Sequence, residues 1–295
     1  MISILIPTYN YNIVPLVEEL HRQTIASKIP FEIIVVDDCS TEQKIQLENQ
    51  SIAKREQCFY LENKVNQGRT ATRNILATKA KYNWLLFLDA DVMLDSKEFI
   101  ESYINSIKNS SADVIFGGVC YQKEQPKKEE ILRWHYGKNR EVKSVNKRTK
   151  NPYFIISQNL LIQKRVFKKA NVINENFYGL DNIFSNMLKK IDAKILHIHN
   201  PVLHLGLEKA SVFLSKSLKS VETTVYFENN NQLDIERPLQ KTYVTFKSYG
   251  ILPVLRMTIK LFEKQLLSNF KSKNPSLFLF DLYRLYYYDK LKRNA

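Results

Sequence analysis

Short apolar runs alternate with amphipathic stretches along the first two hundred residues of the chain. The continuous apolar runs Phe31–Val36 and Trp84–Leu88 are typical of strands buried on both faces of a parallel sheet. Between such runs, residues 14–24 and 69–81 carry apolar side chains at helical spacing. This alternation predicts an α/β domain with a mostly parallel sheet flanked by helices. Further strands are expected at 2–6, 58–61 and 113–119, and a further helix at 96–109, where Asp95 and Glu98 have capping-box spacing. Regular patterns return at residues 153–162 and 181–191.

Two stretches depart from the alternation. Residues 123–150 are rich in Lys and Arg and show little periodicity, so we expect a basic, solvated loop. After Gly206, helical patterns rich in aromatic and basic residues continue to the end of the chain. The sequence therefore predicts an α/β domain over residues 1–206 and a helical C-terminal extension over residues 207–295.

Composition and charge limit which ligands, cross-links and cellular locations we expect for the chain. The formal net charge is +14, so the surface should attract phosphate groups, on whatever molecule carries them. Three cysteines without a CxxC pair argue against a disulfide framework and against a structural zinc site. No apolar run approaches the length of a membrane span, and the first residues lack the features of a secretory signal. A cytoplasmic protein is expected.

Polar side chains follow three of the predicted strands. Residues 7–10 follow the first strand, Asp37 and Asp38 the second, and Asp89 and Asp91 a later one. Ligands of open α/β sheets bind beyond the carboxyl ends of the strands, where these carboxylates should converge. A D-x-D pair there can present two carboxylates to Mg²⁺ or Mn²⁺ shared with substrate phosphates. Turn chemistry also favours Asp, so we expect one of Asp37 and Asp38 to cap a helix and the other to face a ligand.

A second cluster opens the helix after Gly68. Arg69 and Arg73 are four residues apart and therefore share a helical face. They suit an acidic rim or a phosphate at the helix N-terminus, although a solvated helix face is the common role of such arginines. Their position between two acidic strand ends favours the first role.

The motifs PTYN, VVDDCS, NQGRTATRN and FLDADVML, in this order and spacing, resemble glycosyltransferase family 2 over residues 1–205. The resemblance implies the GT-A fold, in which the α/β domain binds a nucleotide. It implies an inverting, metal-dependent enzyme that moves a sugar from a nucleotide-sugar donor, expected to be UDP-linked. The acceptor would be a hydroxyl of a saccharide or of a lipid-linked molecule in polysaccharide or glycolipid assembly at the cell envelope.

The resemblance also assigns roles to single residues. The resemblance implies that residues at the strand ends and on the following helix bind the nucleotide: Pro7, Thr8, Tyr9, Asp37, Asp38, Arg73 and Asp89. Of the two adjacent aspartates, Asp38 is preferred to Asp37 for the contact with the base or ribose. Asp91, Asp89 and His204 are implied as the ligands of the metal, Mn²⁺ or Mg²⁺. Asp181 is implied as the catalytic base, with Asn159 and Gly179 on the acceptor side. A carboxylate base and a metal on the leaving diphosphate suffice for one displacement.

The chain departs from the family pattern in places. Cys39 replaces a glycine, and Leu180 replaces an acidic residue before Asp181. No Q-x-x-R-W follows Asp181, so a processive polysaccharide synthase is not expected.

Two alternative functions have sequence requirements of their own. A nucleotidyltransferase would need a loop rich in Gly and Lys after the first strand, and PTYNYN is not one. A nucleic-acid-binding protein would gather basic and aromatic residues on one face, whereas the strand ends here are acidic. We expect no nucleic-acid partner.

The C-terminal extension contains an amphipathic pattern with one apolar and one basic face. Apolar residues recur at helical spacing between residues 251 and 270, with basic residues on a different face: Leu255, Ile259, Phe262, Leu266 and Phe270 against Arg256, Lys260, Lys264 and Lys271. Such a helix either lies on the inner face of an anionic membrane, as a peripheral enzyme would, or packs on the protein with its cations in solvent. The sequence does not distinguish between these two interpretations.

Overall fold

The computed structural model describes residues 1–173 and 175–294. Its contacts divide the chain into two units, each built from several segments. We call them the α/β unit (Met1–Gln122, Glu141–Asn176 and Met187–Gly206) and the helical unit (Lys123–Arg140, Phe177–Asn186 and Leu207–Ala295).

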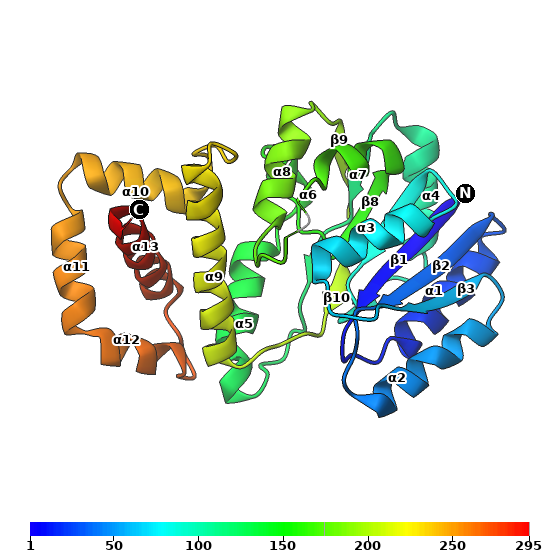
Figure 1. The fold of residues 1–295 in the computed structure, drawn as a ribbon, viewed down its shortest axis with the longest axis horizontal. Helices are drawn as coiled ribbons and strands as arrows, with labels where there is room; N and C mark the ends of the chain where they lie inside the picture. The colour runs from blue at the N-terminus through cyan, green and yellow to red at the C-terminus, as the bar shows by residue number, and fades with distance from the viewer. Residues whose placement is uncertain (174, 295) are drawn as a thin grey trace. The chain divides into compact units, whose positions relative to one another are not determined.

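The α/β unit is built on a seven-stranded sheet in the described part of the chain, with strand order β3-β2-β1-β4-β8-β6-β9 (Figure 1). Its strands are β1 (Ile2–Thr8), β2 (Phe31–Asp37), β3 (Cys58–Glu62), β4 (Trp84–Leu88), β6 (Val114–Phe116), β8 (Asn159–Gln163) and β9 (Ile195–His197). Every neighbouring pair is parallel except the two that β8 makes. The predicted α/β architecture with a mostly parallel sheet is confirmed.

The register of the sheet determines which residues lie next to one another at the carboxyl ends of its strands. Thr8 lies opposite Asp37, and Leu5 lies opposite Phe87. Because β2, β1 and β4 are adjacent and parallel, their carboxyl ends share one edge. The polar residues that follow these strands are therefore neighbours, as predicted.

A second, three-stranded sheet lies beside the first. It consists of β5 (Val92–Leu94), β10 (Val202–His204) and β7 (Val119–Cys120), with β10 antiparallel to β5 and parallel to β7. The single strand expected at 113–119 is therefore divided between two sheets. Gly118 makes the break possible, because its φ of +97° lies in the left-handed region that favours glycine.

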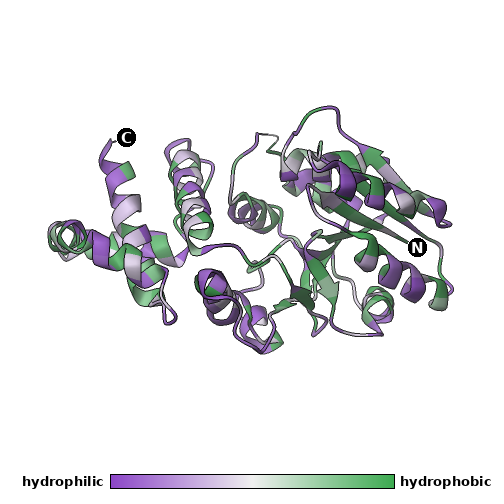
Figure 2. Cartoon of the chain, turned by 90° about the horizontal axis from the view of Figure 1, so that it is seen from below, coloured by the Kyte–Doolittle hydropathy of each residue, from purple (hydrophilic) through white to green (hydrophobic). Residues whose placement is uncertain are grey.

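Helices cover the sheet and supply the remaining core. They are α1 (Val14–Ala26), α2 (Gln43–Gln50), α3 (Arg69–Lys79), α4 (Phe99–Asn109) and α7 (Lys164–Ala170). Apolar residues of β1, β2, β4, α1 and α4 form the main core, and most of them are fully buried. Figure 2 shows this pattern as hydrophobic strands among helices of mixed character.

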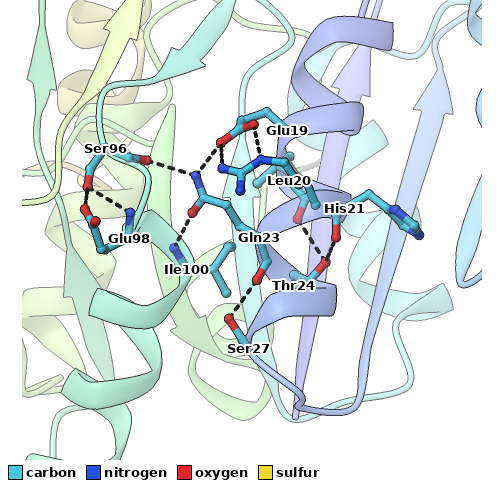
Figure 3. Close-up of polar contacts among 10 residues, drawn as sticks. Glu19, Leu20, His21, Gln23, Thr24, Ser27, Ser96, Glu98 and Ile100 are labelled. Atoms are coloured by element: carbon cyan, nitrogen blue, oxygen red, sulfur yellow. Dashed lines mark hydrogen bonds and ion pairs between the residues drawn. The ribbon is translucent and has the colours of Figure 1, made fainter.

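The start of α4 differs from the prediction. The helix begins at Phe99, and its N-cap residue Glu98 makes no side-chain capping bond, so the expected capping box at Asp95 is wrong. A side chain of α1 takes its place (Figure 3): Gln23 Oε1 accepts from the Ile100 N–H at 3.1 Å, and Gln23 Nε2 donates to the Ser96 carbonyl at 2.9 Å. A buried tertiary contact thus caps this helix, which local spacing cannot reveal.

Residues 123–150 are not the loop that their charge suggested. They contain a short 3₁₀ turn (Lys128–Glu130), α5 (Ile131–Tyr136), a π turn (Gly137–Glu141) and α6 (Val145–Thr149). Within the helical unit, Leu132 is buried and the Arg133 guanidinium lies 5.2 Å from the centre of the Phe213 ring. Arginine stems and guanidinium faces pack well on apolar and aromatic groups, so many cations need not mean a solvated loop.

The helical unit confirms the predicted helical extension. Four helices surround α13 (Leu277–Asn294), as Figure 1 shows: α9 (Ala210–Asn229), α10 (Pro238–Ser248), α11 (Leu252–Leu261) and α12 (Glu263–Phe270). Of the apolar stripe expected in the extension, Leu255, Ile259, Leu266 and Phe270 are buried in this unit. That stripe therefore packs inside the protein. Among the residues that the structure describes, none of the helices combines the length and apolar character that a membrane span requires.

Candidate functional site

The two carboxylates at the end of β2, Asp37 within the strand and Asp38 after it, are held by donors of the protein itself. Asp37 is fully buried and accepts from the Ser40 N–H at 2.7 Å and from the Tyr60 hydroxyl at 2.6 Å. Burial, and then this bond to Asp37, raise the pKa of Tyr60. The expected helix cap before Thr41 is not formed by Asp37, because α2 (Gln43–Gln50) has Glu42 as its N-cap and no side-chain capping bond. Which of the two carboxylates faces a ligand stays a prediction.

Asp38 fastens the loop that leads into α3. Its Oδ1 accepts from Asn63 Nδ2 at 2.8 Å and from the Gln67 N–H at 2.9 Å. Its Oδ2 accepts from the Gly68 N–H at 2.8 Å. The carboxylate thus bonds the backbone where α3 begins, the position that favours negative charge. Cys39, which follows, has a φ of +65°, and this explains why glycine is usual there in the family that the motif resembles.

Asp89 binds two arginines at once. Its Oδ1 lies 2.7 Å from Arg73 Nη2, and its Oδ2 lies 2.6 Å from Arg69 Nη2. The two arginines differ in exposure: the Arg73 side chain is 7% exposed and also donates to the Ser157 carbonyl at 2.8 Å, whereas the Arg69 side chain is 46% exposed. Arg73 therefore serves as an internal support, while Arg69 offers a cation to solvent and to ligands.

Asp91 meets His204 across the small sheet. Pairing of β10 with β5 sets His204 opposite Val92, and His204 Nε2 lies 3.4 Å from Asp91 Oδ2. Burial raises the pKa of Asp91, but His204 and the nearby Arg69 charge outweigh it, so that the pKa is below its ordinary value. This carboxylate is charged at neutral pH although it is largely enclosed.

The Asp91–His204 pair fits a divalent cation. A separation of 3.4 Å is longer than the usual N–H···O distance, and within the described chain the buried Nδ1 of His204 has no hydrogen-bond partner. Two atoms that each lie about 2.1 Å from one metal ion are roughly 3–3.5 Å apart when they are adjacent ligands. Within the described residues, no three His, Cys, Asp or Glu side chains gather as a metal cluster. The pair therefore suits an ion completed by substrate oxygens, as is usual for Mg²⁺ with phosphates.

Gly206 closes the space behind Asp91. A Cβ built on Gly206 would lie 1.9 Å from Asp91 Oδ2 and 2.7 Å from its Cγ. Any side chain there would displace the carboxylate. The second residue after β10 therefore has to be glycine for Asp91 to keep this orientation.

The end of β1 forms the neighbouring wall. Pro7 and Thr8 belong to the strand, Thr8 is buried, and Tyr9 beyond it is 48% exposed. Tyr11 follows, and its pKa is raised by burial and then by the charge of Asp91. The exposed ring of Tyr9 offers a flat surface next to the edge where the β1, β2 and β4 ends meet.

Asn159 does not belong to this surface. Its side chain is fully buried: Nδ2 donates to the carbonyls of Gly118 at 2.8 Å and Asn200 at 2.9 Å, and Oδ1 accepts from the Tyr103 hydroxyl at 2.6 Å. Both polar atoms are thus bonded inside the α/β unit. The expected acceptor-side role of Asn159 is replaced by a structural one.

Gly179 and Asp181 belong to the helical unit. Gly179 has a φ of +91°, and a Cβ there would lie 2.3 Å from Ser220 Oγ, so the turn before α8 (Asp181–Lys190) requires glycine. Asp181 is the first residue of α8. Burial lowers the pKa of Arg237, and Asp181 opposes this shift, so the guanidinium lies within electrostatic reach of that carboxylate. An arginine distant in sequence thus stands near Asp181.

The helical unit also contains a basic hollow of about 630 Å³. Four lysines line it, together with Glu129 and the first residues of α9: Lys127, Lys128, Lys209 and Lys271. Lys209 lies 3.8 Å from Glu129, so one acidic group faces four cations. Its lining favours an anionic ligand.

Sequence reasoning missed two of these residues and preferred the other of two arginines. The resemblance implied Arg73 for the nucleotide, whereas Arg69 is the more exposed of the pair. Ser157, which Arg73 binds, and Arg237 carry no local motif. Their partners come from distant segments, so spacing holds no signal for them.

Comparisons with known proteins agree with the sequence motifs. The model of the family described as "Glycosyl transferase family 2" matches residues 3–170. A Haemophilus influenzae uncharacterized glycosyltransferase is 39% identical over 93 residues, which cover 31% of this chain and 29% of that protein. A Bacillus spizizenii poly(ribitol-phosphate) beta-glucosyltransferase is 36% identical over 119 residues, which cover 39% of this chain and 18% of that protein. The chain thus spans less than a third of the length of these two relatives.

Solved structures are similar over nearly the whole chain. Staphylococcus aureus TarS 1–349 in complex with UDP-GlcNAc has a TM-score of 0.50 at 17% identity, and covers 100% of this chain and 92% of that one. The mannosyltransferase PcManGT from Pyrobaculum calidifontis, in complex with GDP-Man and Mn²⁺, has a TM-score of 0.54 at 12% identity and covers 98% and 86%. At these identities the likeness concerns the fold.

Proposed function

Because the chain belongs to glycosyl transferase family 2, we propose that it moves a sugar from a nucleotide-sugar donor to an acceptor hydroxyl. The GT-A fold expected from the motifs is confirmed by the structural likenesses. The observation that carries the proposal is the Asp91–His204 pair beside the exposed Arg69. A carboxylate, an imidazole and a guanidinium at one sheet edge suit a metal-bound diphosphate.

The donor would lie along the carboxyl edge of β1, β2 and β4. Pro7, Thr8 and Tyr9 would line the nucleotide, with the Tyr9 ring exposed for stacking. Asp37 and Asp38 would shape the pocket by fixing the turns on either side. We propose UDP as the nucleotide, since the TarS structure of the same fold was solved with UDP-GlcNAc.

The diphosphate would be held by cations. Arg69 would bind its oxygens, and Arg73 would keep Asp89 and the Ser157 loop in position behind it. Asp91 and His204 would bind the divalent ion, Mn²⁺ or Mg²⁺, which supplies charge neutralisation for the leaving diphosphate. Both oxygens of Asp89 are already bonded to arginines, so Asp89 would reach the metal only through a bound water.

Asp181 would accept the proton of the attacking hydroxyl. Asp181 stands at the first position of α8, and the Arg237 guanidinium lies within electrostatic reach of it. One base and one leaving diphosphate define a single displacement, which inverts the anomeric centre. We therefore propose an inverting and non-processive transfer.

The acceptor is proposed to be an envelope saccharide or a lipid-linked one that carries phosphate. Two observations support phosphate: the basic hollow of four lysines in the helical unit, and relatives that act on poly(ribitol phosphate). The second is a property of those proteins, and it defines the first acceptors to try.

A donor screen tests the proposal. The full chain is incubated with UDP-, GDP- and CMP-sugars in Mn²⁺, with a polyol-phosphate polymer as acceptor, and release of the free nucleotide is measured. Release from one donor, enhanced by the acceptor and abolished in Asp181→Asn, is expected. Glu175→Gln, an exposed change before α8, is the control. Absence of release from every donor would contradict the proposed function.

A further inference from the structure

Helix α11 is apolar on two sides. Leu252, Leu255 and Ile259 face the core of the helical unit and are buried. Val254, Met257 and Leu261, spaced by three and four residues, share another face and are 59%, 67% and 69% exposed. A contiguous set of exposed apolar side chains rimmed by polar residues marks an interaction or membrane surface. The second face therefore suits an apolar environment that the described chain does not provide.

The exposed face continues beyond both ends of the helix. Tyr249 and Ile251 precede it and are 77% and 38% exposed, and Phe262 follows it at 47%. Gly250 between them has open space around its Cβ position. We call these six residues the α11 ridge: Tyr249, Ile251, Val254, Met257, Leu261 and Phe262. This ridge is distinct from the stripe expected from the sequence, which is buried apart from Phe262.

Cations flank the α11 ridge. Lys247 precedes it, Lys260 lies within α11, and Lys264 follows, all exposed. Within the described chain none of the three forms an ion pair. One exposed acid, Glu263, lies next to Phe262 and accepts a hydrogen bond from the Tyr283 hydroxyl at 3.0 Å. Three cations against one carboxylate leave the surroundings of the ridge net positive.

We infer that the α11 ridge docks the protein on an anionic lipid bilayer. The apolar side chains would enter the boundary between headgroups and acyl chains, and the three lysines would bind lipid phosphates. Apolar residues flanked by Lys are typical of helices that lie in a membrane interface. Protein–protein interfaces are instead depleted in Lys, which argues against a second copy of the chain or another protein on this face.

The inference goes beyond the proposed function and does not depend on it. It concerns where the enzyme acts: a docked chain would meet acceptors that are held at a membrane. Binding to lipid is measured without donor or acceptor, so failure of the sugar transfer leaves this test intact, and the reverse also holds.

The test is vesicle co-sedimentation of the full chain. Vesicles of phosphatidylcholine alone are compared with vesicles that also contain phosphatidylglycerol, at low and at high salt. The double variant Met257→Ser/Leu261→Ser removes the centre of the ridge. Its matched control is Phe278→Ser, since Phe278 is 68% exposed on α13. The variant Lys260→Gln/Lys264→Gln removes two cations, with Lys290→Gln on α13 as its control. All of these side chains are exposed, and thermal melting verifies the fold.

We expect binding to the anionic vesicles only, reduced by salt. The lysine variant should bind roughly 20-fold to 30-fold more weakly, since each lysine near such a surface contributes about a fivefold factor. The ridge variant should lose at least as much, and both controls should bind like the wild type. Equal sedimentation of the ridge variant and wild type would overturn the inference. Concentration-dependent dimers that the ridge variant abolishes, without vesicle binding, would overturn it in favour of a second copy.

Discussion

His204 Nε2 lies 3.4 Å from Asp91 Oδ2, and the pairing of β10 with β5 brings the two side chains together. His204 cannot be replaced by a neighbouring residue of β10, because adjacent residues of a strand point to opposite faces, and Asp91 lies in the turn just before β5. The small sheet thus fixes the geometry of the proposed metal pair.

Gly206→Ala should weaken metal-dependent nucleotide binding without removing a ligand. The added methyl would lie 1.9 Å from Asp91 Oδ2, so the carboxylate must rotate away from His204. We expect roughly 10-fold to 100-fold weaker Mn²⁺-dependent UDP binding in calorimetry, as for changes in residues that position metal ligands. The melting temperature should stay close to the wild type. Unchanged UDP affinity would show that Asp91 does not hold the metal in this orientation.

Substitution of the two arginines that bind Asp89 should have different effects: one should lower the stability of the fold and the other should weaken UDP binding. Arg73→Gln leaves the enclosed Asp89 with one partner fewer and should lower the free energy of unfolding by about 3 kcal/mol, measured by urea denaturation. Arg69→Gln, at the exposed position, should keep the stability and bind UDP roughly 10-fold to 100-fold more weakly. The reverse assignment would place the diphosphate on Arg73.

Asp181→Asn should retain donor affinity and lose transfer. The amide cannot take a proton, so turnover should fall by about 10²–10⁴-fold, while UDP-sugar binding stays within twofold to threefold of the wild type. Rates of nucleotide release with and without acceptor give the comparison, with Glu175→Gln as control. Near-normal turnover of the variant would exclude Asp181 as the base.

His197 should make the fold sensitive to acid. Arg148 can only donate, so His197 Nδ1 accepts from it at 3.3 Å and Nε2–H donates to the Pro152 carbonyl at 2.8 Å. Burial lowers the pKa of His197, and Arg148 lowers it further. Above about pH 6.5 the ring is neutral in both the folded and the unfolded state. Below that value the unfolded chain takes up the proton first, so stability falls as the pH falls.

The measurement is the free energy of unfolding as a function of pH in wild type and His197→Gln. The histidine contributes a loss of at most about 1.4 kcal/mol per pH unit below pH 6.5, down to the lowered pKa. The Gln variant keeps one acceptor and one donor, and its stability should depend less steeply on pH in this window. Parallel curves would mean that His197 is not the responsible group.

The parallel sheet and its polar edge could be predicted, because buried strands and strand-end carboxylates leave local signals. Trp84–Leu88 was predicted with its observed bounds, and Asp37, Asp38 and Asp89 lie at the expected edge. The protein groups that bond to those carboxylates could not be predicted. Tyr60, Gly68 and Arg73 reach them only through tertiary folding.

Three errors share one physical cause. Asn159 resembled a ligand-binding residue, α5 resembled a loop, and Asp95 resembled a helix cap. In each case a contact between residues distant in sequence determines the observed role: Tyr103 binds Asn159, Phe213 covers Arg133, and Gln23 caps α4. The apolar pattern expected over residues 251–270 is divided in the structure between α11 and α12, with Phe262 exposed between them. Helix α11 also has a second, exposed apolar face, which the pattern did not reveal.

Calorimetric titration of UDP into wild type and Asp91→Asn, with Mn²⁺ and with a chelator, tests the central claim most directly. We predict that the wild type binds UDP at least 10-fold more tightly with Mn²⁺. Asp91→Asn should bind UDP weakly in both conditions, and the control Asp95→Asn, exposed after β5, should behave like the wild type. An Asp91→Asn variant that keeps the full Mn²⁺ enhancement would contradict the proposed metal pair of Asp91 and His204.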